Sequence, residues 1–116
     1  MNTEKQGGDI MKAISIKQPF IDLIIKGQKT LEIRSWQTKV RGDVLLCSSA
    51  NPKIKGLLSG YALAIAEIVD CRPFMKKDAM LACCGYEPGL YAWELANIRK
   101  IKPFPVKGKL GFFHKG

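Results

Sequence analysis

Three ionisable residues of complementary charge stand close together in the first third of the chain. Lys29, Glu32 and Arg34 lie within a run of six residues. Leu31 and Ile33 alternate with the two charged residues that follow Lys29, which is the period-two pattern of a half-buried strand. Glu32 and Arg34 therefore share one strand face, and Lys29 stands at the entrance to the strand. We expect a polar pocket in which an anion lies between two cations.

The chemistry open to these residues ranges from ligand binding to catalysis. Lys29 could contact a phosphate or a carbonyl group, act as a nucleophile or general base, or be an exposed lysine after a helix. A buried carboxylate nearly always needs a cationic partner, so Glu32 and Arg34 could pair only to rigidify the strand. We expect both roles, with Arg34 orienting Glu32 and Glu32 contacting Lys29 or a ligand.

Glu67 is a second notable carboxylate, on a later predicted strand. It alternates with Leu63 and Ile65, so it is expected to point where these apolar side chains point. An inward glutamate is costly unless it is paired, and Lys29 or Arg34 could be its partner. The alternative is a residue at the mouth of a barrel that reaches water.

The elements that must position these side chains can be predicted from apolar spacing. A short helix begins near Pro19, buries Phe20, Leu23 and Ile24, and ends at Gly27. A second short helix is predicted from Lys77 onward, and a basic loop covers residues 51–60. Alternating segments predict strands at residues 12–16, 29–35, 44–48, 61–69, 90–101 and 110–113. Five or six strands with short helices predict an α+β fold, a small and mostly antiparallel barrel.

Length and charge narrow the possibilities further. The chain has 116 residues, enough for one domain, which we place at residues 11–116 behind a mobile leader at residues 1–10. The formal net charge is +9, from 19 Lys and Arg against 10 Asp and Glu. Such an excess favours an anionic partner such as RNA or a nucleotide, although a basic surface can also serve solubility alone.

Several classes of protein are disfavoured by the sequence. The cysteines and the single histidine show no spacing typical of a zinc site, so we predict no metal and no cofactor; these residues are Cys47, Cys71, Cys83, Cys84 and His114. The start of the chain is polar, unlike a signal peptide, and no apolar run approaches the roughly 20 residues that cross a bilayer. We expect a cytoplasmic protein without membrane contact, and the oligomeric state stays open.

Five segments of the chain resemble the ASCH family, the activating-signal-cointegrator homology domains. The resemblance spans nearly the whole chain and includes the complete G-x-K-x-x-E-x-R signature at residues 27–34. A Gln-Pro pair upstream, an Arg-Gly pair downstream and a glycine-rich aromatic ending add to it. The matching segments are residues 15–20, 27–36, 41–42, 90–95 and 107–113.

The resemblance implies a PUA-like β-barrel flanked by short helices, with a cleft lined by the signature and a role in binding nucleic acid. A few small bacterial relatives are amidohydrolases that act on N4-acylated cytidine nucleosides with a lysine, a threonine and a glutamate. Their lysine corresponds to Lys29 and their glutamate to Glu67, whereas Glu32 occupies the threonine's position.

The sequence thus favours a domain that binds RNA or a nucleotide in a basic cleft. The alternatives are a small hydrolase, either this amidohydrolase or a ribonuclease, and a protein-interaction module. The catalytic candidates are Lys29, Glu32 and Glu67. Trp36 is the preferred residue for stacking on a base, whereas Phe20 is expected in the core. The candidates for ligand contact are Lys17, Gln18, Lys29, Arg34, Trp36, Arg41, Ser48, Ser49, Lys53 and Lys55.

Overall fold

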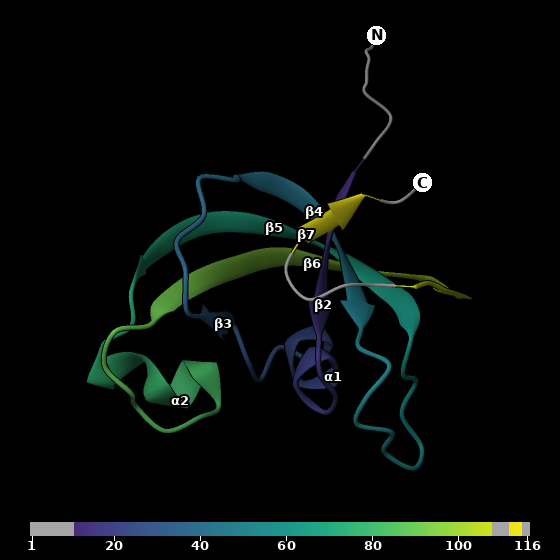
Figure 1. The fold of residues 1–116 in the computed structure, drawn as a ribbon, viewed down its shortest axis with the longest axis horizontal. Helices are drawn as coiled ribbons and strands as arrows, with labels where there is room; N and C mark the ends of the chain where they lie inside the picture. Colours follow the sequence, from purple (N-terminus) through teal and green to yellow (C-terminus); the bar gives the residue numbers. More distant parts are fainter. Residues whose placement is uncertain (1–10, 108–111, 115–116) are drawn as a thin grey trace, which may run out of the picture.

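Six strands form one curled sheet in the computed structural model, which describes residues 11–107 and 112–114. The sheet has the order β3-β6-β5-β4-β2-β7 and curls into a half-barrel that arches over helix α1 (Figure 1). β2 and β4 run parallel, and the other neighbouring strands described are antiparallel. The strands are β2 (Lys12–Ile16), β3 (Leu31–Arg34), β4 (Gly42–Ser48), β5 (Tyr61–Pro73), β6 (Tyr91–Pro105) and β7 (Phe112–His114).

Short helices flank this sheet at two places. Helix α1 (Phe20–Ile25) lies under the concave face and buries Ile21 and Ile24 in the main core. A 3-10 turn, η1 (Lys76–Asp78), continues into helix α2 (Ala79–Ala82) near β3 (Figure 1). Because α1 fills the hollow of the half-barrel, the apolar core lies between this helix and the sheet.

The edge strand β3 is packed differently on its two faces. Leu31 and Ile33 belong to a small apolar cluster shared with α2. Glu32 and Arg34 point the other way, toward the interior of the half-barrel, where Trp93 of β6 lies directly opposite Glu32 in the strand register. Because β3 pairs only with β6 in the described sheet, its second edge faces the opening of the half-barrel.

The turn after α1 brings Lys29 to the start of β3. Pro19 precedes the first helical residue and Gly27 follows the last turn, as the sequence predicts. Gly27 has a φ of +82°, a left-handed conformation that glycine adopts without steric cost. The backbone N–H groups of Gln28 and Lys29 then donate to the Leu23 carbonyl, at 2.9 and 3.1 Å. The chain is thereby folded back over the end of the helix.

Two strands are longer than the sequence predicts. β5 continues to Pro73, and β6 continues past residue 101 through Pro103 to Pro105. Prolines were expected to end β6, because proline cannot donate a hydrogen bond to the ladder. β3 covers only Tyr91–Glu94 of β6, so beyond Glu94 one side of β6 has no paired strand in the described sheet. A missing N–H group costs little on such a free side.

The predicted sharing of one face of β5 by Leu63, Ile65 and Glu67 holds for Ile65 and Glu67 and fails at Leu63. From residue 64 to residue 67 the register with β4 is regular, and Ile65 packs in a second apolar cluster, on the face opposite the main core. The register then shifts so that Leu63 is an extra residue between the partners of Leu46 and Cys47. Because of this bulge Leu63 joins Ala64 in the main core, while Ala62 packs with Ile65.

The remaining elements lie close to their predicted positions. β3 is shorter than residues 29–35, and the second helix starts with the turn η1 before Lys77. Of the last predicted strand, the described part is β7, which pairs antiparallel with β2. The proposed leader at residues 1–10 lies outside the described residues. The α+β class and the small barrel-like sheet with short helices are confirmed, consistent with a PUA-like fold.

Candidate functional site

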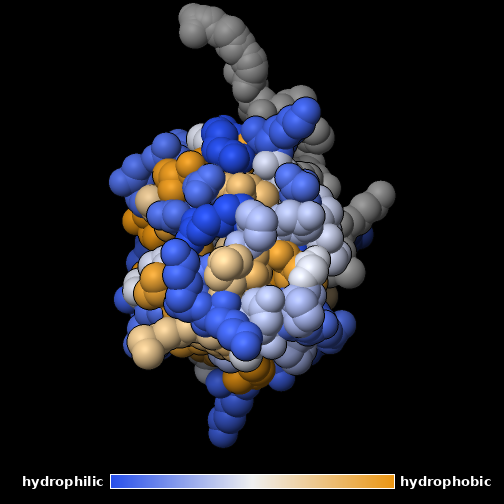
Figure 2. All heavy atoms as spheres, turned by 90° about the vertical axis from the view of Figure 1, so that its left-hand side faces the viewer, coloured by the Kyte–Doolittle hydropathy of each residue, from blue (hydrophilic) through white to orange (hydrophobic). Residues whose placement is uncertain are grey.

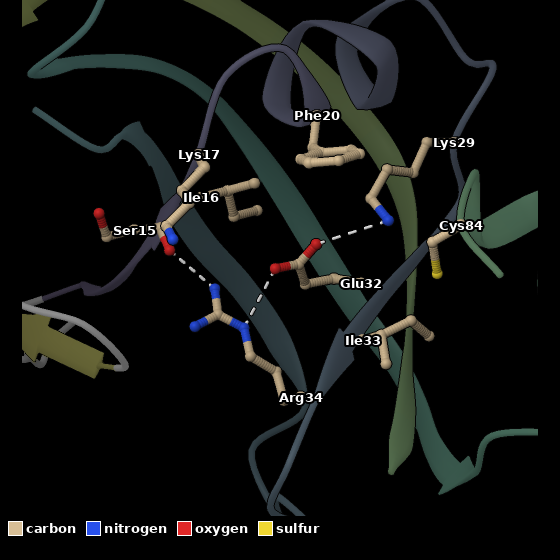
Figure 3. Close-up of a pocket in the computed structure, with 9 residues that line it drawn as sticks. All are labelled: Ser15, Ile16, Lys17, Phe20, Lys29, Glu32, Ile33, Arg34 and Cys84. Atoms are coloured by element: carbon tan, nitrogen blue, oxygen red, sulfur yellow. Dashed lines mark hydrogen bonds and ion pairs between the residues drawn. The ribbon is translucent and has the colours of Figure 1, made fainter. Parts of the chain in front are cut away.

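A cavity of about 250 Å³ opens between β2, the start of α1 and the free edge of β3. Figure 3 shows the carboxylate of Glu32 at its centre, between the side chains of Lys29 and Arg34. The ring of Phe20 forms one wall. The lining residues are Ser15, Ile16, Lys17, Phe20, Lys29, Glu32, Ile33, Arg34 and Cys84.

Glu32 contacts a cation on each side. Its Oε2 lies 3.1 Å from Arg34 Nε, and its Oε1 lies 3.7 Å from Lys29 Nζ. This confirms the predicted carboxylate–guanidinium contact on one face of the strand. Burial raises the pKa of Glu32 above its ordinary value, and the charges of Arg34 and Lys29 oppose this rise.

Lys29 is the most enclosed charge of the site, with 4% of its surface exposed. Its Nζ donates to the backbone carbonyls of Leu31 at 2.7 Å and Ala82 at 2.6 Å. With Glu32 as a third neighbour, these acceptors match the three N–H donors of an ammonium group. Lys29 therefore ties the start of β3 to the end of α2, and its charge lies below the Phe20 ring, 5.5 Å from the centroid.

Arg34 bridges the opening of the half-barrel. Its Nη2 donates to the Ser15 carbonyl at 2.7 Å, which links β3 to β2, a strand that is not its neighbour in the sheet. Its guanidinium carbon lies 5.5 Å from the ring centroid of Trp36 and 5.8 Å from that of Trp93. The Nε atom is buried without an aligned hydrogen bond, although Glu32 is near. Arg34 therefore keeps donor capacity at the floor of the cavity.

Of the other predicted contact residues, only Lys17 lines this cavity. Trp36 is 40% exposed and packs edge-on against Trp93, with 5.5 Å between ring centroids, beside the cavity rather than in it. Arg41 lies 3.9 Å from Asp70 in an ion pair and donates to backbone carbonyls of the preceding loop.

Three predicted polar contacts hold the fold together instead. Gln18 is buried, and its Nε2 donates to Asp22 at 2.8 Å and to the Leu58 carbonyl at 2.9 Å. Ser48 exchanges hydrogen bonds with the backbone of Tyr61. The Ser49 hydroxyl bonds to the Ser15 hydroxyl at 2.8 Å, next to the cavity. These groups position the wall of the site.

The basic loop at residues 51–60 lies on the far side of α1 from Lys29. Lys53 and Lys55 are exposed there, and Lys53 donates to the Ala50 carbonyl at 3.0 Å. The same loop borders a second cavity of about 310 Å³, which Lys26 and Lys100 also line. None of these lysines lines the first cavity.

Glu67 does not join the site, and of the alternatives that the sequence left open, pairing with Lys29 or Arg34 is not found among the described contacts. Its carboxylate accepts a hydrogen bond from Asn97 at 2.6 Å. In the strand register it stands opposite Asp43, which pairs with Arg99. Glu67 shares its face of β5 with Ile65, as the alternation predicts, but this face packs in the second apolar cluster and not in the main core around α1.

Sequence reasoning missed several lining residues. Phe20 was expected in the core but is 36% exposed on the cavity wall. It occupies the first residue of α1, at the end of the helix that faces the opening, and this position was the available signal. No local pattern announces Cys84, which reaches the site because Lys29 binds the end of α2.

The cysteines show no sign of metal binding. Among the residues that the structure describes, no group of three or more His, Cys, Asp or Glu side chains could hold an ion. Cys47 is buried, and burial raises the pKa of its thiol to about 11. Within the same residues, no helix is both long and apolar enough to span a lipid bilayer.

The sequence matches the model of one known family. The family model of the ASCH domain matches residues 14–105, which include both the signature at residues 27–34 and every residue that lines the cavity. A comparison with curated proteins found no match. Since the matched span covers most of the 116 residues, the chain belongs to the ASCH domain family.

Proposed function

We propose that this domain binds RNA and holds one base in the cavity between β2, α1 and β3. The observation that carries the proposal is Arg34, whose guanidinium lies at the floor of the cavity with Nε 3.1 Å from Glu32 and Nη2 donating to Ser15, while its other N–H groups have no hydrogen bond among the described residues. Lying at the floor of an open cavity, such donors are expected to meet a polar ligand.

The walls of the cavity support a flat, anionic ligand. Phe20 offers an exposed aromatic ring, and bases of single-stranded RNA stack on such rings. Lys17 lies at the rim and is exposed, in position for a phosphate. The volume of about 250 Å³ is below the roughly 300–1,000 Å³ of pockets for drug-sized ligands. This scale suits a single base rather than a larger compound.

The surface near α2 carries both apolar and positively charged side chains, which can contact the bases and the phosphates of RNA. On the end of the molecule that carries α2, apolar patches lie among hydrophilic side chains (Figure 2). Met75, Met80, Leu81 and Tyr86 are exposed there, and Lys76 Nζ lies 5.9 Å from the Tyr86 ring centroid. Together with the net charge of +9, these features fit a partner with phosphates and stacking bases.

Hydrolysis is the weaker proposal for this geometry. Lys29 donates to two backbone carbonyls and lies beside a carboxylate, so its nitrogen is enclosed by acceptors rather than directed at a substrate. Glu67, the other residue needed for acid–base work, is bound to Asn97 outside the cavity. A general base must lie within hydrogen-bond reach of the proton it removes.

The test compares RNA binding by wild type with binding by two matched variants. Phe20→Ala removes the wall of the cavity, whereas Val69→Ala removes part of an apolar side chain that is 38% exposed on β5 and lines neither cavity. We expect Phe20→Ala to weaken binding of a short single-stranded RNA about tenfold, because stacking on an aromatic ring contributes ~1–3 kcal/mol per base. Val69→Ala is expected to bind like wild type. Fluorescence anisotropy at low salt measures both affinities.

Two outcomes would contradict the proposal. The first is an absence of RNA binding by wild type at low salt, which favours a protein-interaction module. The second is hydrolysis of an N4-acylcytidine by wild type that both Lys29→Ala and Glu67→Gln lose. In that case the domain is an enzyme, and the enclosure of Lys29 must open during the reaction.

A further inference from the structure

The polar floor of the cavity presents donors and acceptors side by side. Arg34 carries five N–H donors, of which one is used in a hydrogen bond to Ser15, while the Nε–H group lies beside Glu32, with 3.1 Å between Nε and Oε2. Beside it stands Glu32, whose two oxygens accept and cannot donate when the group is ionised. Figure 3 shows both groups facing the same hollow below Phe20.

Lys29 does not add a free donor to this pattern. Its ammonium is held by the carbonyls of Leu31 and Ala82 and by Glu32. The pattern that a bound base meets is therefore one donor group, Arg34, next to one two-oxygen acceptor group, Glu32. A base that fits must carry an acceptor next to two adjacent donors.

We propose that Glu32 and Arg34 select guanine as the base held in this cavity. Guanine carries the O6 acceptor next to the N1–H and N2–H donors on one edge, so a carboxylate can accept from both donors while a guanidinium donates to O6. Adenine, cytosine and uracil each present one donor on the corresponding edge and would leave a carboxylate oxygen unpaired. The inference rests on the proposed RNA binding and adds the identity of the base.

Burial makes this selection effective. Glu32 and Arg34 are both about nine-tenths buried, so a polar atom left without a partner there cannot turn to bulk water. A site that hydrogen-bonds a particular group of its ligand discriminates strongly against analogues that lack this group. A hydrophobic pocket discriminates less strongly against a ligand that lacks one methyl group. Stacking on the Phe20 ring contributes affinity for any base, whereas hydrogen bonds to Glu32 and Arg34 discriminate among the bases.

The experiment measures binding of wild type to four RNA heptanucleotides of uridine that differ in the central base. We expect the guanine-centred RNA to bind about tenfold more tightly than the RNAs centred on adenine, cytosine or uracil. An inosine at the centre lacks only the 2-amino group and is expected to lose about threefold to tenfold of the affinity. This comparison uses the unaltered protein, so it does not depend on the folding of a variant.

A variant pair tests the residue. Glu32→Gln replaces one acceptor oxygen by a donor and is expected to bring the four affinities within about twofold of one another. Glu87→Gln makes the same chemical change on an exposed loop and is expected to keep the preference for guanine. Circular dichroism confirms that both variants are folded before they are compared.

The possible failures can be told apart. Equal binding of all four RNAs, or preference for another base, overturns the guanine inference while RNA binding stands. Loss of the preference in Glu87→Gln as well as in Glu32→Gln also overturns it. If no RNA binds at all, both this inference and the proposed function are wrong.

Discussion

At the scale of single residues, the site is a buried carboxylate held by two cations. Taking ions out of water is costly, and the attraction between them offsets that cost only when the geometry supplies further hydrogen bonds. Lys29 donates two such hydrogen bonds to backbone carbonyls, and Arg34 donates one. The cations therefore join β2, β3 and α2, while Glu32 keeps oxygens at the surface of the cavity.

Removing the lysine is expected to destabilise the fold strongly. Lys29→Met should lower the free energy of unfolding by about 3 kcal/mol, because it leaves Glu32 with one cation fewer and two carbonyls without a donor. Lys39→Met, at an exposed position, should change it by less than about 0.5 kcal/mol. Urea unfolding followed by fluorescence measures both. Equal unfolding midpoints for the two variants would show that these contacts add no stability.

The titration of Glu32 predicts a pH dependence of stability. Burial raises its pKa in the folded protein above the ordinary value of 4.5, which the unfolded chain keeps. The folded state therefore binds this proton more tightly, so the contribution of Glu32 is most favourable below pH 4.5 and is lost as the pH rises through the native pKa. We expect the stability of wild type relative to Glu32→Gln to fall as the pH rises above about 4.5.

Denaturant unfolding at a series of pH values measures this difference. Glu87→Gln serves as the control, since Glu87 is exposed and its removal should leave the pH profile unchanged. A rise in the relative stability of wild type with pH would mean that Arg34 and Lys29 outweigh burial, so that the native pKa lies below 4.5.

At the scale of elements, the site depends on the turn between α1 and β3. Gly27 ends the helix in a left-handed conformation, and the next two N–H groups return to the Leu23 carbonyl. These two hydrogen bonds therefore fix the position of Lys29, two residues before β3, and of Glu32, within β3. The apolar face of β3 packs against α2. The position of the strand is therefore fixed both by the turn after α1 and by α2.

A substitution at this turn tests its importance. Gly27→Ala should destabilise the protein by about 1 kcal/mol, because a side chain makes a φ of +82° unfavourable although the space around Gly27 is open. Gly85→Ala is the control, since Gly85 has equally open space and no left-handed φ. It should be neutral or slightly stabilising through the entropy of the unfolded chain. Thermal unfolding measures the melting temperature of both variants. Equal melting temperatures would show that the left-handed conformation of Gly27 does not matter for stability.

At the scale of the whole molecule, positive charge is spread well beyond the cleft. Lys53 and Lys55 lie on the loop beyond α1, whereas Lys76 and Lys77 lie on η1 at the other end. An RNA that enters the cavity between α1 and β3 can extend toward either group. The path of the RNA determines which lysines contact its phosphates, and these contacts release the counterions of the RNA.

The salt dependence of binding identifies this path. Lys53→Ala combined with Lys55→Ala should weaken RNA binding and flatten the plot of log affinity against log salt, by about 0.7 for each lost phosphate contact. The double variant Lys76→Ala with Lys77→Ala removes the same charge at the other end of the molecule and tests the alternative path. An unchanged slope in the first variant would show that the loop at residues 51–60 does not touch phosphate. Equal flattening in both would indicate a general effect of net charge.

Much of the fold and of the charged floor follows from local patterns in the sequence. Alternation places Glu32 and Arg34 on one face because side chains on a strand alternate with a period of two, whatever the strand later packs against. Gly27 ends the helix for an equally local reason, its freedom to adopt positive φ. The α+β class and the ASCH family follow from such segments taken together.

Tertiary structure alone decided which distant groups meet at this floor. A bulge places Leu63 in the main core, whereas Ile65 and Glu67 lie on the opposite face of β5, away from Lys29. A bulge depends on pairing with the neighbouring strand, so the residues of one strand do not reveal it. The carbonyl of Ala82, the thiol of Cys84 and the carbonyl of Ser15 reach the site through packing of α2 and closure of β2 toward β3. Phe20 lies on the wall because the half-barrel stays open there, and apolar spacing along a helix cannot tell a core from the rim of an opening.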